Sequence, residues 1–124
     1  MGPRLMDADE RHRLMEEGRR AFNRGEFYES HEFWEEVWDV IDDPDRTWVQ
    51  GMIQLATGLH KLQRDRPDVC RTLFAKALAK LADAPATLDG YDLGKLRTDA
   101  TAVQAAVERG ERPDPLAVKL IKAT

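Results

Sequence analysis

The stretch that decides the fold of this chain is Glu29-Ser30-His31-Glu32-Phe33-Trp34-Glu35-Glu36-Val37-Trp38. We expect it to lie in a helix from about residue 26 to 41. Because each helical residue advances by about 100°, one flank of this helix is apolar and the other is acidic. The apolar flank, which we expect to be buried, holds Phe27, Phe33, Trp34, Val37, Trp38 and Ile41. His31 and Glu35 fall on the border between the two flanks.

The segments around this helix also have helical patterns. A first helix is predicted from an N-cap at Asp7 to about Arg24, with Gly25 as a left-handed C-terminal cap, so that the first two helices form a tight antiparallel hairpin. Further helices are predicted over about 45–63, 67–84 and 93–109, the last capped by Asp92. Residues 85–92 are expected to be a loop, and no segment alternates for long enough to predict a strand. The tail should dock on the core through Leu116, Val118, Leu120 and Ile121.

These patterns predict an all-α fold, a single compact bundle of about five helices. The chain of 124 residues, 42% hydrophobic and 34% charged, has the length and composition of one globular domain over residues 1–124. Short apolar runs predict neither a membrane span nor a secretory segment, so a cytoplasmic location is expected. The net charge of -4 makes nucleic-acid and membrane partners unexpected, whereas a homo-oligomer, a partner protein and a small ligand stay open. The single cysteine, Cys70, excludes an intramolecular disulfide.

The border of the second helix is the candidate functional site. His31 and Glu35 are four residues apart and can meet, either to bind a divalent metal ion together or to act as a coupled acid and base. Glu32 could add an oxygen ligand, and His60 on the third helix could add another group. The alternative is that Glu35 only satisfies His31 by a hydrogen bond, since two ligands are too few for a structural zinc site.

The third helix carries polar residues that could face this site. Gln50 and Gln54 share a side of the helix with Gly51 and Gly58, and paired glycines in a helix indicate the close approach of a neighbour. If that neighbour is the second helix, both glutamines would reach toward His31 and Glu35. Gln50, Gln54 and Trp38 are therefore the candidate residues that orient a ligand or substrate.

Two blocks of the chain carry a family resemblance. They are the run Phe22–Glu32 followed by Trp34-Glu35-Glu36 and Trp38, and the run Gln50–Ala56 followed by His60. Together they resemble the domain-of-unknown-function 309 family, whose motif HxxxExxW corresponds here to His31, Glu35 and Trp38. The resemblance covers about residues 10–85 and leaves the fifth helix and docked tail, about 93–124, outside it. It implies a small all-helical protein with a suggested metal-binding role for the motif, and it implies no established activity.

Three functions are compatible with these residues. The first is a metal- or small-ligand-binding site formed by His31 and Glu35 with Glu32 and His60. The second is a helical module that binds a partner protein, and the third is a motif that serves only as a structural hydrogen-bond lock. The sequence identifies neither a substrate nor a cofactor beyond a candidate divalent metal ion, and it leaves open whether the protein is an enzyme.

Overall fold

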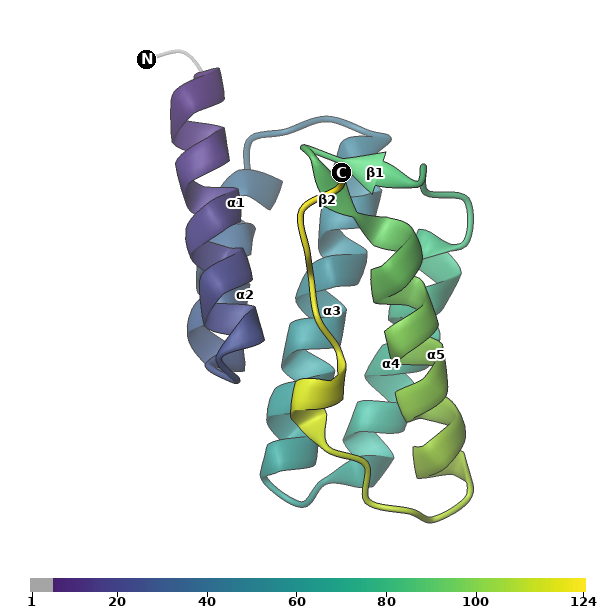
Figure 1. Cartoon of the computed structure of the whole chain (residues 1–124). Coiled ribbons are helices and arrows are strands. Elements are labelled where there is room, and N and C mark those ends of the chain that lie inside the picture. Colours follow the sequence, from purple (N-terminus) through teal and green to yellow (C-terminus); the bar gives the residue numbers. More distant parts are fainter. Residues whose placement is uncertain (1–5) are drawn as a thin grey trace.

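The computed structural model describes residues 6–124, and it is mostly helical. In chain order, the helices are α1 (Ala8–Asn23), α2 (Phe27–Trp38), α3 (Asp45–Gln63), α4 (Pro67–Leu81) and α5 (Leu93–Glu108). The strands β1 (Thr87–Leu88) and β2 (Tyr91–Asp92) lie between α4 and α5, and a 3-10 helix, η1 (Pro115–Ala117), follows α5. The predicted bundle of about five helices is therefore confirmed, with a small two-stranded sheet added (Figure 1).

The first two helices pack against each other as an antiparallel pair, as predicted. Asp7 accepts a hydrogen bond from the Glu10 amide at the start of α1, and Gly25 ends the helix with φ of 82°. Gly18 lets α2 approach closely, because a Cβ atom there would lie 2.1 Å from Trp34 Nε1. The Ser30 hydroxyl uses the same closeness to donate to the Gly18 carbonyl at 2.9 Å.

Helix α2 ends three residues before the predicted boundary. The guanidinium of Arg46 stacks over the Trp38 ring at 3.7 Å and also donates to the Trp38 carbonyl at 3.2 Å. A side chain from the start of α3 thus takes up a carbonyl that a longer helix would have used. Helix α4 also ends early, at Leu81 rather than Ala84, where Arg97 of α5 donates to the carbonyls of both residues.

The region predicted as a loop contains a short hairpin. Leu88 pairs with Tyr91 across the turn residues Asp89 and Gly90, both of which have positive φ. An Asp-Gly pair between two short strands is the residue choice that a two-residue turn with positive φ requires. After the turn, Asp92 caps α5 as predicted by accepting from the Lys95 amide at 2.8 Å.

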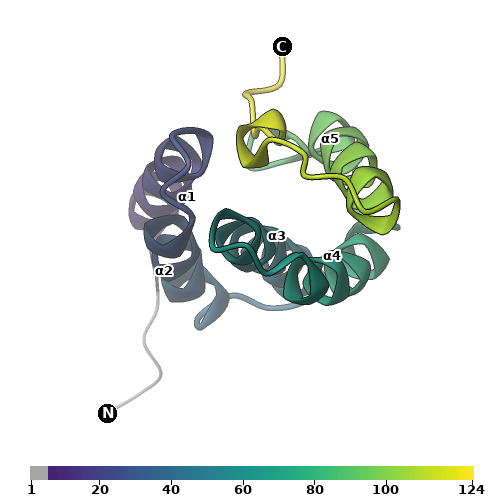
Figure 2. The same ribbon diagram turned by 90° about the horizontal axis from the view of Figure 1, so that it is seen from below.

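The C-terminal tail lies along the open side of the helices, between α1 and α5 (Figure 2). Val118 and Leu120 are fully buried, as predicted for a docked tail, whereas Leu116 and Ile121 remain 40% and 38% exposed. Asn23 of α1 holds the backbone of Leu120 through two hydrogen bonds of 2.8 and 2.9 Å. The tail therefore closes one wall of the hydrophobic core.

The buried apolar side chains form one cluster to which all five helices contribute. Phe27 and Trp34 are buried in it as predicted, and Phe33 and Trp38 pack against it while partly exposed. Within residues 6–124, none of the helices combines the length and the apolar character that crossing a membrane requires.

Candidate functional site

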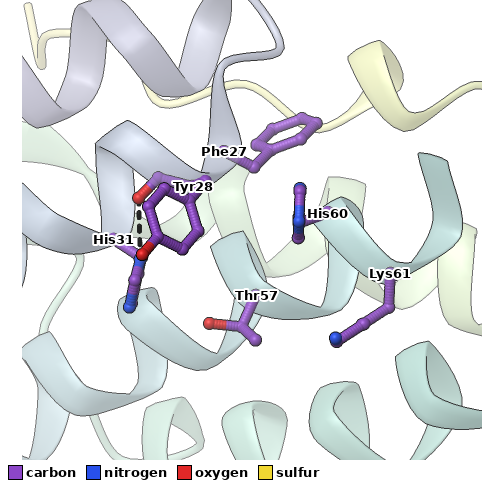
Figure 3. Close-up of a pocket in the computed structure, with 6 residues that line it drawn as sticks. All are labelled: Phe27, Tyr28, His31, Thr57, His60 and Lys61. Atoms are coloured by element: carbon purple, nitrogen blue, oxygen red, sulfur yellow. Dashed lines mark hydrogen bonds between the residues drawn. The ribbon is translucent and has the colours of Figure 1, made fainter. Parts of the chain in front are cut away.

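A pocket lies between the N-terminal half of α2 and the C-terminal half of α3 (Figure 3). It encloses about 170 Å³ and is lined by Phe27, Tyr28, His31, Thr57, His60 and Lys61. We call it the α2–α3 pocket. Because α2 and α3 run in opposite directions, the start of one helix lies beside the end of the other. This arrangement brings His31 and His60 to the same space.

His31 uses both of its ring nitrogens within α2. Its Nδ1 lies 2.7 Å from the carbonyl oxygen of Tyr28, and its Nε2 lies 3.4 Å from Glu35 Oε1. Since a carbonyl oxygen can only accept, Nδ1 carries a proton, and the ion pair with Glu35 then requires a second proton on Nε2. The structure thus places the predicted pair in contact, and both contacts are local to one helix.

Tyr28 lies between the two histidines. Its ring centroid is 5.1 Å from that of His31 and 5.9 Å from that of His60. Tyr28 is 53% exposed, so it forms an outer wall of the pocket, while Phe27 is buried and its ring points away from Tyr28 (Figure 3). The α2–α3 pocket therefore combines aromatic surfaces with imidazole nitrogens.

The α3 side of the pocket supplies groups that lack partners. The side chains of His60 and Lys61 make no hydrogen bond or ion pair with any residue in the described range. Partial burial, followed by the charges of Arg64 and Lys61, lowers the pKa of His60 below its ordinary value. Its imidazole is consequently neutral at pH 7 and presents one N–H donor and one acceptor.

Thr57 completes the α3 wall. Its hydroxyl donates to the Ile53 carbonyl one turn earlier, at 3.0 Å, so its remaining hydrogen-bonding capacity is that of an acceptor.

The other predicted site residues do not converge on this pocket. Glu32 is exposed and does not line it. Neither Gln50 nor Gln54 bonds to His31 or Glu35, and Gln54 Oε1 is buried without a hydrogen-bond partner among the described residues, as is Trp38 Nε1. A Gln-His-Glu network between α2 and α3 is therefore not formed.

The close contacts at the α3 glycines are made with a different helix from the one expected. Atoms added at Gly51 and Gly58 would meet Leu81 and Phe74 of α4, at 2.9 and 2.7 Å. The close neighbour of this side of α3 is thus α4 rather than α2, contrary to the expectation from sequence. No hydrogen bond joins either glutamine to His31 in the described part of the chain.

A metal centre with three or more protein ligands does not fit the described residues. Within residues 6–124, no group of three His, Cys, Asp or Glu side chains is placed to hold one ion. His31 and Glu35 provide two adjacent ligands, whereas the Tyr28 ring lies between His31 and His60. Two ligands fall short of the three or four that protein zinc sites use.

Comparison with known proteins finds a family match over the part of the chain that contains the pocket. Residues 15–73 match the model of a protein family described as Domain of unknown function (DUF309). This part of the chain is therefore similar to the DUF309 family. The match includes every residue that lines the α2–α3 pocket, whereas α5, the hairpin and the tail lie beyond the DUF309 match.

One curated relative extends the similarity beyond the residues of the DUF309 match. A protein of Aquifex aeolicus (strain VF5), described as "Uncharacterized protein", is 30% identical over 112 residues. The alignment includes 90% of this chain and 34% of the relative. The chain therefore spans about a third of the length of the relative that it matches.

The pocket includes two residues to which sequence reasoning gave no role in a ligand site, namely Thr57 and Lys61, and Tyr28, which the sequence indicates only as an exposed aromatic of a protein-binding groove. Some signal for them was present, because Tyr28 and His31 are three residues apart and Thr57 and Lys61 are four apart, so each pair shares a helix face. The missing information was which side of α3 faces α2, and helical periodicity does not contain it.

Proposed function

We propose that the α2–α3 pocket is a binding site for a small organic molecule. The observation that carries the proposal is that His31 and His60, from two different helices, open on one space of about 170 Å³ with the Tyr28 ring against both. Pockets that bind small molecules are mostly apolar with a few convergent polar groups. Phe27 and Tyr28 provide the apolar lining. The convergent polar groups are those of His31, His60 and Lys61.

The unpartnered side chains favour binding over a purely structural role. Polar groups that serve only to hold a fold are normally paired, because an unpaired group in a partly dry site costs free energy. The side chains of His60 and Lys61 have no such partners among the described residues. A bound molecule would supply them.

A structural lock is less well supported. The contacts of His31 with the Tyr28 carbonyl and with Glu35 remain inside α2, and they do not tie α2 to α3. Glu35 is 51% exposed on its side chain, and exposed pairs of this kind contribute little to stability.

A divalent metal ion on His31 and Glu35 is the competing form of the site. It is tested by metal analysis of protein purified without a histidine tag, alongside His31→Ala and Glu35→Ala. If the wild type binds a stoichiometric amount of metal, and both variants fold but lose it, the site is a metal site and the proposal of an organic ligand is wrong.

The binding proposal is tested with a panel of small uncharged and charged fragments, followed through backbone amide resonances. The expected result is that binding fragments shift the resonances of residues 27–31 and 57–61. Thr57→Phe, which fills the pocket, should abolish these shifts.

Thr72→Phe is the matched control for that variant. Thr72 donates to the Asp68 carbonyl one turn earlier, as Thr57 does to Ile53, but it lies on an exposed face of α4. Fragment shifts that persist in Thr57→Phe, or that appear elsewhere on the chain, would contradict the proposal.

A further inference from the structure

We infer that the ligand of the α2–α3 pocket is a small organic anion with a flat apolar body and a carboxylate or phosphate end. This inference rests on the proposed binding function and adds the chemical class of the ligand. It follows from the free ammonium group of Lys61, from the arrangement of the nearby carboxylates and from the aromatic lining.

Lys61 provides the charge for the anionic end. Its ammonium group lines the pocket and has no carboxylate within ion-pair distance in the described part of the chain. Figure 3 shows the amine extending along α3 toward Thr57, away from the adjacent residue His60. The ammonium is a charge-assisted donor for an oxyanion, and the imidazole of His60 adds an N–H donor to the same pocket.

The carboxylates near the pocket do not cancel this charge. Glu35 lies against His31 and is directed to the exposed side of α2, outside the lining residues. Glu29 acts on His60 more weakly than either Arg64 or Lys61 does. Lys61 therefore keeps its positive charge unpaired among the described residues, although the chain as a whole carries a net charge of -4.

The aromatic walls suit a flat apolar body. Tyr28 is 53% exposed, so a planar group can enter from solvent and lie against its ring, while the buried Phe27 lies at the floor of the pocket. A space of about 170 Å³ has the volume of roughly six liquid waters. That size fits a single ring with one short substituent rather than a nucleotide.

Three probes of nearly the same shape test whether the charge of the ligand, rather than its size, determines binding. Benzoate and phenyl phosphate carry the anionic end, and benzamide is the uncharged counterpart of benzoate. Binding is followed by the ring resonances of the histidines, of which the chain has three. His31 and His60 report on the pocket, and His12, exposed on α1, is the internal reference.

Lys61→Met removes the charge and keeps most of the side-chain length. Lys76→Met is the matched control, because Lys76 is an exposed lysine of α4 with no ion pair in the described range. We expect both anions to shift His31 and His60 but not His12, and benzamide to bind about tenfold more weakly than benzoate. Lys61→Met should weaken benzoate binding about tenfold, as the loss of one charge-assisted hydrogen bond does, and Lys76→Met should not.

The contrary results separate this inference from the proposed function. Equal affinity for benzoate and benzamide, or no effect of Lys61→Met, would overturn the anion assignment and leave the pocket as a binding site. Failure of all three probes to shift His31 and His60 would overturn the anion assignment as well. The fragment panel with Thr57→Phe would then test separately whether the pocket binds any small molecule.

Discussion

The polar side chains that join α1 to the C-terminal tail and those of the α2–α3 pocket differ in how they are partnered. Glu16 accepts from Arg19, Lys122 and Tyr91, and Asn23 bonds twice to the backbone of Leu120. We call these residues of α1, β2 and the tail the α1–tail cluster. In the α2–α3 pocket, by contrast, the side chains of His60 and Lys61 have no partner among the described residues.

This difference separates groups that serve the fold from groups that are available for a ligand. A buried or half-buried polar group that is fully bonded stabilises one arrangement of the chain, and removing it leaves its partner unpaired. A group without an internal partner contributes little to that arrangement. Substitutions in the α1–tail cluster should therefore lower the free energy of unfolding. Substitutions in the α2–α3 pocket should instead lower the affinity for a ligand.

The largest effect is expected at the seam between α1 and α2. Gly18→Ala would place a Cβ atom 2.1 Å from Trp34 Nε1, in a position where neither helix can move without disturbing the core. We expect a loss of about 3 kcal/mol of unfolding free energy, measured by urea denaturation. Gly94→Ala in α5 is the control, because its nearest contact would be Asp92 Oδ1 at 3.3 Å. Equal losses in the two variants would show that the seam is not tightly packed.

The second effect concerns the tail. Asn23→Ala removes both hydrogen bonds to Leu120, whose side chain is fully buried. We expect a loss of about 2 kcal/mol, because an N–H and a carbonyl are left without partners. Thr101→Ala on the exposed face of α5 is the control and should change stability by less than about 0.5 kcal/mol. If Asn23→Ala were as mild as the control, the tail would not be held by this residue.

The third effect is a pH dependence in the α1–tail cluster. Hydrogen bonds from Arg19, and then from Lys122, lower the pKa of Glu16 from 4.5 to about 2. A carboxyl whose pKa is lower in the folded state stabilises the fold above pH 4.5, and this stabilisation is lost as the pH falls toward 2. Glu16→Gln should cost about 1.5 kcal/mol at pH 7.

The pH profile makes this third prediction specific. The difference in unfolding free energy between wild type and Glu16→Gln should shrink between pH 4.5 and pH 2. A difference that stays constant over this range would show that the charge of Glu16 does not contribute.

The smallest effect is the coupling of His31 with Glu35. The two side chains meet at 3.4 Å, and Glu35 is 51% exposed. A double-mutant cycle with His31→Ala and Glu35→Ala should give a coupling of about 0.4 kcal/mol at low salt. A coupling above about 1.5 kcal/mol would instead support the structural lock.

The sequence was most informative where structure depends on neighbouring residues. Asp7, Gly25 and Asp92 were predicted as caps and act as such, and α3 begins and ends where its pattern predicts. Caps and helical periodicity are local properties, so a single sequence contains them. The Asp89-Gly90 turn was equally local, and its Asp-Gly pair could have predicted the hairpin.

The sequence was least informative about which helices are neighbours. Gly51 and Gly58 did indicate a close contact, but the partner is α4 instead of α2. Helix α2 ends earlier than predicted because Arg46, a residue outside this helix, donates a hydrogen bond to the Trp38 carbonyl. The candidate site was therefore predicted only in part. His31, Glu35 and their contact could be predicted within one helix, whereas Tyr28, Thr57 and Lys61 became visible once the arrangement of α2 and α3 was known.

The central claim is that the unpartnered groups of the pocket serve a ligand rather than the fold, and Lys61→Met tests it most directly. The measurement is urea unfolding of wild type and variant, each with and without benzoate at about ten times the wild-type Kd. The account predicts equal stability without benzoate, and a stabilisation by benzoate of about 1.4 kcal/mol in wild type that falls below about 0.5 kcal/mol in the variant. A variant that is less stable than wild type but equally stabilised by benzoate would contradict it.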